Sequence, residues 1–251
     1  MTLSPLHRIL ATLLLCVSAW HANATLVLAG SGTTVNFYYD DAFWSPGSAT
    51  VVGDRITFAL LPALSGSATD GAPAYADRAS APDAAAVLVL AKSGYSFASA
   101  PFTVTASLAG GYALAPVGGS VAGFQAASVH HGSFAGGLFT SDGMLGSTLA
   151  DAGAVSDGVA TSAAFAPTEL ALSAGALAGA HEALGLLDVF FYAFAQQDGS
   201  GLSSAQLDSL SYAVSAAAVS TLPEPGSLPL LASALGLGAC IGRQRRAKRA
   251  A

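Results

Sequence analysis

Aromatic and acidic side chains gather in one short segment of this 251-residue chain, Phe37–Trp44. Asp40 and Asp41 follow three aromatic residues, and Trp44 closes the segment. An indole face can stack on a sugar ring, and carboxylates accept hydrogen bonds from sugar hydroxyls. The segment therefore suggests a glycan contact at Asp40, Asp41 and Trp44. The competing interpretation is the end of a strand whose rings enter the core, and we prefer it because large aromatic residues are mostly buried.

Other patterns typical of enzymes are incomplete. His181-Glu182 begins the zinc-protease motif H-E-x-x-H, but Gly185 stands where the second histidine is required. His130 and His131 are neighbours, so on a strand their side chains point to opposite faces, and a surface pair is the simpler interpretation. Aspartates beside glycine are explained by turn formation rather than by a glycosidase carboxylate pair. We therefore predict a protein without catalytic residues.

Metal and cofactor chemistry has little support in the sequence. Residues 25–222 contain no cysteine, which excludes thiolate metal sites there, and no cofactor is expected. Loop oxygens leave one weak calcium site open as an alternative, although the spacing of an EF-hand is absent.

The charges are few and unevenly placed. Charged residues make up 10% of the chain, and five of the nine Lys and Arg residues lie in its last nine positions. Residues 25–222 keep three basic residues against 14 acidic ones, a formal charge of −11. Such a body repels phosphate groups, so the composition excludes nucleic acid as a partner.

Alternation of apolar and polar residues predicts half-buried strands at 33–39, 55–60, 102–108 and 210–218. Residues 187–195 are apolar on both faces apart from Asp188, which predicts a central strand covered on both sides. Seven Asp-Gly and Gly-Gly pairs suit the positive φ of hairpin turns, and residues 94–123 are expected to form successive hairpin strands. These pairs lie at 70–71, 142–143, 157–158, 198–199, 110–111, 118–119 and 136–137.

Two stretches are less regular. Residues 62–86 contain three prolines among Gly, Ser and Ala and are expected to form a long surface loop. Thr168–Leu187 is rich in Ala and Leu, but three glycines interrupt it, so we predict a strand followed by a loop or a short helical turn. Together the patterns predict an all-β fold, a single β-sandwich-like domain over residues 25–222.

The first 24 residues have the order of a secretory signal peptide. A weakly positive start at Arg8 precedes an apolar run at 9–19, and Ala22 and Ala24 supply the small residues of a cleavage site. We expect a mature chain that begins at Thr25.

Residues 223–251 carry three features in a fixed order. The prolines of Pro223-Glu224-Pro225 hold the chain extended. An uncharged apolar run at 228–242 follows, shorter than the roughly 20 residues of a permanent membrane span. A basic cluster then favours a cytoplasmic end, and it comprises Arg243, Arg245, Arg246, Lys248 and Arg249.

This order resembles the PEP-CTERM sorting tail of Gram-negative bacterial surface proteins, with Pro229 inside the span as a departure. The resemblance implies that exosortase, a membrane-embedded cysteine peptidase, recognises Pro223, Glu224 and Pro225, with the basic cluster as a stop-transfer signal. It also implies transient anchoring in the inner membrane by a single-span sorting helix. Release to the cell envelope or the outside follows, commonly alongside exopolysaccharide and biofilm formation. An uncleaved single-span anchor is the alternative.

The sequence thus predicts an exported, non-catalytic surface or extracellular-matrix protein, sorted by an exosortase-like system and associated with exopolysaccharide. The alternative is a carbohydrate-binding module or a matrix-processing hydrolase that uses the segment Phe37–Trp44.

Overall fold

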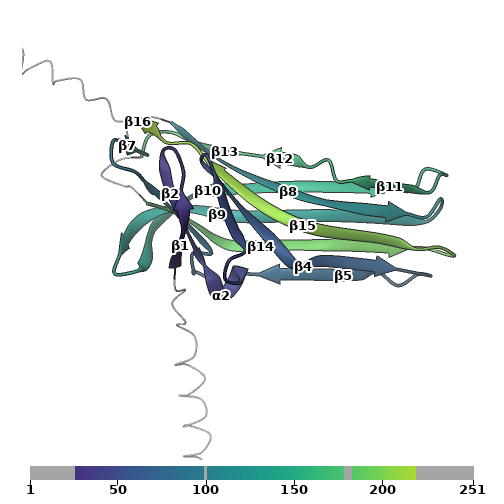
Figure 1. Ribbon diagram of the computed structural model, residues 1–251. Helices are drawn as coiled ribbons and strands as arrows, with labels where there is room; N and C mark the ends of the chain where they lie inside the picture. The colour runs from purple at the N-terminus through teal and green to yellow at the C-terminus, as the bar shows by residue number, and fades with distance from the viewer. Residues whose placement is uncertain (1–25, 99–100, 178–182, 219–251) are drawn as a thin grey trace, which may run out of the picture. The chain divides into compact units, whose positions relative to one another are not determined.

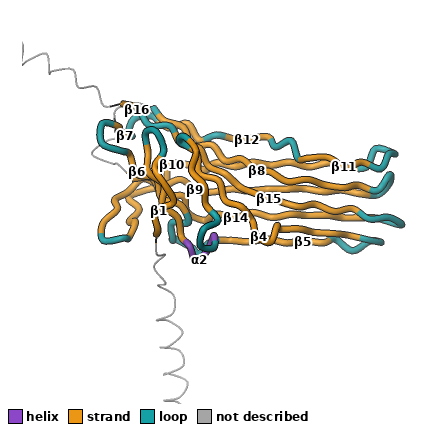
Figure 2. Tube along the Cα trace, in the orientation of Figure 1, coloured by secondary structure: helices purple, strands orange, loops and turns teal. Residues whose placement is uncertain are grey.

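The computed structural model describes residues 26–98, 101–177 and 183–218, and these residues form antiparallel strands with one short helix, α2 (Asp41–Trp44) (Figure 1, Figure 2). Two sheets make up the fold. The larger one, sheet A, has eight strands, and seven of them follow the spatial order β1 (Leu26–Ser31), β2 (Val35–Asp40), β6 (Val87–Ala91), β14 (Ala183–Gln197), β9 (Gly119–Ala135), β10 (Leu138–Val155), β12 (Thr168–Leu170). Its eighth strand, β5 (Ala74–Ala79), pairs with β14.

The second sheet, sheet B, has six strands. Five of them follow the spatial order β11 (Thr161–Ala164), β8 (Phe102–Leu114), β15 (Ser203–Val214), β4 (Arg55–Ala68), β3 (Ala49–Val52), and β13 (Leu172–Ala174) also pairs with β8. A small separate pair joins β7 (Tyr95–Ser96) to β16 (Ala217–Ala218). The expected all-β fold of antiparallel sheets is confirmed.

The core lies between the inner faces of the two sheets, as in other β-sandwiches. The alternation in the sequence placed these faces correctly in four strands. Their fully or nearly buried residues are Val35, Phe37 and Tyr39 on β2, Ile56, Phe58 and Leu60 on β4, Phe102, Val104, Ala106 and Leu108 on β8, and Leu210, Tyr212 and Val214 on β15.

Residues 62–86 do not form the expected long loop. Strand β4 continues to Ala68, and β5 covers 74–79. Pro62 is tolerated because the register between β4 and β15 shifts between Ala59 and Leu64, so no ladder hydrogen bond is required of its nitrogen.

Two of the expected glycine turns are also absent, and the pairs at 70–71, 118–119, 157–158 and 198–199 lie where the chain crosses from one sheet to the other and not in hairpins. The successive hairpins expected over residues 94–123 are therefore wrong, because β8 and β9 belong to different sheets. Gly110 lies inside β8, where a Cβ would overlap the carbonyl oxygen of Gln206 on β15, so this glycine allows two backbones to approach closely. Gly143 lies inside β10, at a shift in its register with β9. The pair Gly136-Gly137 does form the β9–β10 turn, with φ of 61° and 84°.

One edge of the sandwich is closed by residues 161–174, which alternate between the sheets. Here β11 and β13 pair with β8 of sheet B, while β12 pairs with β10 of sheet A. The buried Thr148 connects these layers, because its hydroxyl donates to the Leu170 carbonyl at 2.9 Å and accepts from the Ala106 N–H at 3.0 Å. The strand predicted at the start of Thr168–Leu187 is confirmed as two short strands, β12 and β13. Residues 178–182 lie outside the described part, and residues 183–187 belong to β14 and not to the expected loop or helical turn.

The predicted signal peptide and sorting tail also lie outside the described residues. This holds for Ala22 and Ala24, for Pro223, Glu224 and Pro225, and for the basic cluster, so these assignments stay predictions. Among the residues that the structure describes, no helix is long and apolar enough to cross a membrane.

Candidate functional site

The segment Phe37–Trp44 does not form a sugar platform. Asp40 caps α2, because its carboxylate accepts the N–H of Ala42 at 3.0 Å, and Asp41 occupies the first turn of this helix. Trp44 is only 2% exposed, and its indole N–H donates to the Ala86 carbonyl at 3.1 Å.

The ring of Trp44 belongs to an inner stack, which we define as Trp44, Phe58 and Phe191. Its centroid lies 3.9 Å from that of Phe58 at 9°, and 5.6 Å from that of Phe191 at 6°. Phe58 comes from sheet B and Phe191 from sheet A, so the stack joins the two sheets. A sugar cannot reach a ring that is buried in this way. The glycan interpretation of Trp44 is therefore wrong, and the core interpretation is confirmed.

The histidine pair lies on β9 near its turn to β10. The Nδ1 atom of His130 lies 2.8 Å from the hydroxyl of Ser141, across the hairpin. Both histidines are partly exposed.

Four partly or largely exposed rings gather on the outer face of sheet A. We define the aromatic patch as Tyr75 on β5, Phe190 and Tyr192 on β14, and Phe124 on β9. Tyr75 is 53% exposed, and the other three rings are half-buried. Tyr192 lies at the centre, with ring centroids 5.3 Å from Tyr75, 5.3 Å from Phe124 and 5.8 Å from Phe190.

The strand register places a carboxylate at each end of this patch. Asp77 on β5 is directly opposite Tyr192, Tyr192 is opposite Phe124, and Phe124 is opposite Asp151 on β10. Directly paired residues point to the same face of a sheet, so these four side chains form one row across four strands. Three strand spacings make the row about 14 Å long. Both aspartates are exposed.

The ionisation of the two tyrosines reflects these neighbours. Burial, followed by the negative charge of Asp151, raises the pKa of Tyr192. The pKa of Tyr75 is raised by burial and then by the charges of Asp77 and Tyr192. Both phenols therefore keep their protons through neutral pH and can donate hydrogen bonds.

Sequence reasoning missed the patch, although one signal for it was present. The stretch 187–195 is apolar on both faces, which predicted a strand covered on both sides. The structure confirms a central strand, but it leaves the outer rings at 190 and 192 partly exposed. A strand with aromatic residues on both faces carries either a second packing layer or a binding surface, and periodicity alone does not distinguish these cases.

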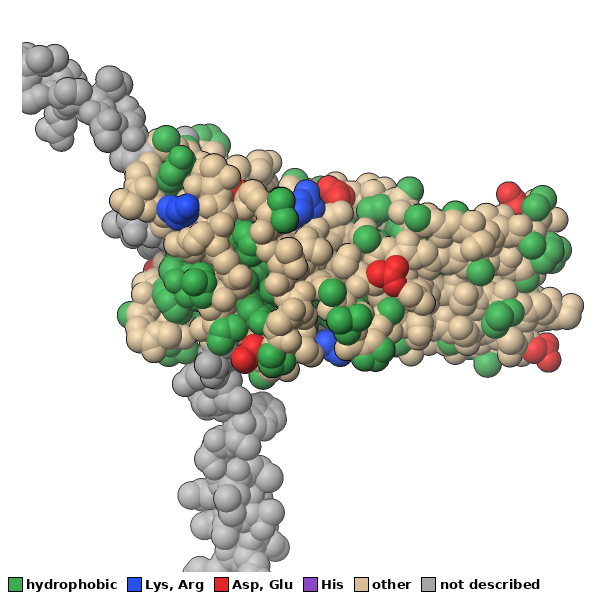
Figure 3. Space-filling view, viewed as in Figure 1, with side chains coloured by type: hydrophobic (Ala, Val, Ile, Leu, Met, Phe, Trp, Pro, Cys, Tyr) green, Lys and Arg blue, Asp and Glu red, His purple; other side chains and the backbone are tan. Residues whose placement is uncertain are grey.

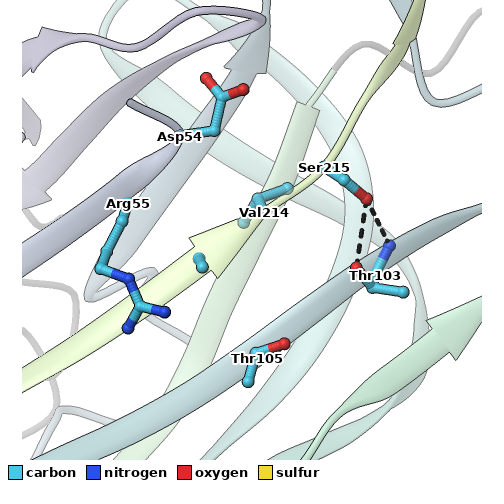
Figure 4. A pocket seen from close by; sticks show the side chains of 7 residues that line it. Asp54, Arg55, Thr103, Thr105, Val214 and Ser215 are labelled. Atoms are coloured by element: carbon cyan, nitrogen blue, oxygen red, sulfur yellow. Dashed lines mark hydrogen bonds between the residues drawn. The ribbon is translucent and has the colours of Figure 1, made fainter. Parts of the chain in front are cut away.

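A shallow pocket of about 330 Å³ lies on sheet B (Figure 4). Most of its polar side chains are already bonded within the protein. The guanidinium of Arg55 donates to the Ser211 hydroxyl at 2.8 Å. The carboxylate of Asp54 accepts from the N–H and hydroxyl of Thr34, each at 2.8 Å, and Ser215 bonds Thr103. The pocket therefore offers a ligand fewer free polar atoms than the patch does.

Charged side chains are sparse on the face seen in Figure 3. Within residues 26–98, 101–177 and 183–218, no three His, Cys, Asp or Glu side chains lie close enough together to hold a metal ion. The aromatic patch with its two carboxylates is thus the arrangement best suited to contact a ligand.

The chain matches no family model, and the search of curated proteins returned no match. Solved structures with some similarity include xylanase 10C of Cellvibrio japonicus in complex with xylopentaose, at 12% identity and a TM-score of 0.18 over 75% of this chain and 28% of that one. The xylan-binding module CBM15 shows 11% identity and a TM-score of 0.18 over 77% and 98%. Alginate lyase A1-II′ of polysaccharide lyase family 7 shows 12% identity and a TM-score of 0.17 over 59% and 81%. Similarity this low does not assign a fold family or a ligand.

Proposed function

We propose that this protein is a non-catalytic, exported surface or extracellular-matrix protein that binds exopolysaccharide through the aromatic patch. The observation that carries the proposal is the row of Asp77, Tyr192, Phe124 and Asp151 across the outer face of sheet A. The proposed sugar contact is this row, in place of the segment Phe37–Trp44 that the sequence suggested.

The chemistry of the row suits a carbohydrate chain. The C–H groups of a sugar ring carry partial positive charge and pack against the negative face of an aromatic ring. The hydroxyls around the same sugar need hydrogen-bond partners, which the carboxylates of Asp77 and Asp151 and the phenol of Tyr192 supply. A row about 14 Å long, which ends on the edge strand β5, suits a segment of a polymer.

Delivery to the polysaccharide would follow from the two ends of the chain. The signal peptide would export the protein, and the tail would anchor it transiently in the inner membrane until an exosortase-like peptidase cleaves near Pro223-Glu224-Pro225. The released body would then stay in the cell envelope or the extracellular matrix, where biofilm polysaccharides accumulate.

Binding is tested by affinity electrophoresis of the exported protein in gels that contain a panel of bacterial and plant polysaccharides. Tyr192→Ala and Phe124→Ala are expected to weaken binding about tenfold or more, as central aromatic contacts usually do. The matched control is Tyr38→Ala, which removes an outward tyrosine of the same sheet that packs on Phe134 instead, at 5.4 Å. Equal weakening by the control, or no retardation by any polysaccharide, would contradict the proposal.

Sorting is tested by the intact mass of the protein recovered outside the cell. We expect a chain that begins at Thr25 and has lost the basic cluster, and Glu224→Ala should leave the precursor uncleaved. Glu169→Ala, an exposed position on β12, is the control and should not alter processing. A recovered protein that still ends at Ala251 would favour the uncleaved anchor.

A further inference from the structure

The aromatic patch lies in a negative electrostatic environment. Asp77 and Asp151 are exposed at its two ends, each directly opposite an aromatic residue of the row. The effect of Asp151 on the pKa of Tyr192 indicates that its charge reaches the central ring. A ligand on these rings would therefore lie between two carboxylates.

The basic side chains of the described residues do not neutralise this charge. Arg78 follows Asp77 on β5, so it points to the opposite face, and it donates to the Phe43 carbonyl at 3.3 Å. Lys92 donates to the carbonyl of Gly32 at 3.0 Å. The remaining one, Arg55, bonds Ser211 on sheet B. Each basic residue in the described part is thus engaged away from the patch.

Aromatic faces and carboxylates share one preference, which is for cations. An ammonium group above a ring face is attracted by the negative charge of the π system, and a nearby carboxylate adds a direct attraction. A chain of uronate sugars would meet repulsion from the same two aspartates.

We infer that the patch selects an amino-sugar polymer with free ammonium groups, such as a partly de-N-acetylated aminoglycan, over neutral polymers and most strongly over polyuronates. This inference rests on the proposed function, because it names the class of polysaccharide that the same patch binds. The rings would hold the faces of the sugars, while Asp77 and Asp151 would pair with ammonium groups along the chain.

The test compares binding of the exported protein to immobilised chitosan, xylan and alginate as cationic, neutral and anionic probes. We expect chitosan to bind at least tenfold more tightly than xylan at low salt, and alginate to bind most weakly. Affinity for chitosan should fall as sodium chloride is raised, since exposed charges are screened.

The variant that isolates the charges is Asp77→Asn with Asp151→Asn, which keeps the size of both side chains. It should reduce affinity for chitosan about tenfold and affinity for xylan by a clearly smaller factor, because an asparagine oxygen still accepts a hydrogen bond from a hydroxyl but carries no charge. The control is Asp157→Asn with Asp208→Asn, which removes the same two charges from exposed positions outside the row. Equal loss in the control would mean that only net charge matters and would overturn the inference.

The outcomes separate the two proposals. Binding to xylan without a preference for chitosan would refute the cationic ligand and leave polysaccharide binding intact. Alginate that binds as tightly as chitosan would refute it as well. Absence of binding to all three polymers would contradict the proposed function itself.

Discussion

Two groups of aromatic side chains share the strand β14 but have opposite environments. The inner stack receives Phe191, which is fully buried and lies parallel to Trp44. The aromatic patch receives Phe190 and Tyr192, which remain partly exposed on the other face. Residues next to each other on one strand thus serve packing in one case and offer a surface in the other, so aromatic content alone does not reveal a binding site.

A bulge in β14 decides which rings go to which face. Before it, the buried core positions are Leu184 and Leu186, and after it they are Val189 and Phe191. The register with β9 shifts between Leu187 and Phe190, where Asp188 has a φ of 50°. One extra residue reverses the alternation, so the even positions that point inward before the bulge point outward after it.

Insertion of one alanine between Val189 and Phe190 should have the largest effect, because one more residue reverses the alternation of the following positions again. The residues of the aromatic patch on β14 would turn into the core, and Phe191 would turn outward. We expect a loss of more than about 5 kcal/mol in the free energy of unfolding, seen as loss of cooperative urea unfolding. The control is Asp188→Gly, which keeps the bulge at positive φ and should stay within about 1 kcal/mol of the wild type. Unchanged unfolding of the insertion variant would show that the number of residues along β14 does not set the two environments.

Alanine variants of the neighbouring residues Phe191 and Phe190 compare directly how much the inner and the outer ring contribute to stability. Phe191→Ala should lower the free energy of unfolding by about 3–5 kcal/mol, because it leaves a cavity beside Trp44. Phe190→Ala removes a half-buried ring from the outer face and should cost about 1 kcal/mol. Urea titration followed by circular dichroism provides both values. Similar losses in the two variants would mean that the outer ring is as much part of the packing as the inner one.

A third prediction concerns alkaline pH. Burial raises the pKa of Tyr212, whose hydroxyl is fully enclosed and has no hydrogen-bond partner in the structure. The folded state then holds this proton more tightly than the unfolded state, so stability should be full below pH 10 and fall as the pH rises further. Tyr212→Phe should flatten this decline and, at neutral pH, change stability by no more than about 1 kcal/mol.

The matched tyrosine for this experiment is Tyr192, whose pKa is raised by burial and Asp151 but which remains partly exposed. Tyr192→Phe should leave most of the alkaline decline in place. The pH dependence of urea unfolding tests both variants, and an equal response would contradict the difference in environment between the core and the outer face.

The smallest expected effect separates the ring of Tyr192 from its hydroxyl. Tyr192→Phe keeps the ring face and should change polysaccharide affinity by about twofold to threefold, since one hydrogen bond that exchanges with water contributes little. Stability at neutral pH should not change measurably. A loss as large as that of Tyr192→Ala would show that the hydroxyl, and not the ring face, makes the main contact.

Local sequence patterns were sufficient to predict the inward face of a strand where one face is buried and the other is polar. The faces of β2 and β8 followed directly from alternation, because a period of two admits one core-facing set. Sequence patterns predicted the wrong local structure where the same residue type occurs in two different structural settings. Gly110 resembles a turn residue but allows close contact of two strands, and Pro62 resembles a loop residue but lies at a break in strand pairing.

The site was less accessible to sequence reasoning than the fold. The candidate at Asp40, Asp41 and Trp44 rested on proximity along the chain, and the structure buried its tryptophan. The four members of the row come from positions 77, 124, 151 and 192, which only strand pairing brings together. Nothing local to any one of these residues marks it as part of a surface.

The sequence by itself determined the all-β class, the inward faces of the regular strands and an acidic, cysteine-free body. These properties depend on composition and on the two-residue period of a strand, which are local. Tertiary structure alone decided that the rings of one strand divide between core and surface, and that Asp77 and Asp151 bracket the outer ones. Both outcomes depend on a bulge and on pairing between distant segments, because register is set by the packing of whole sheets and not by neighbours along the chain.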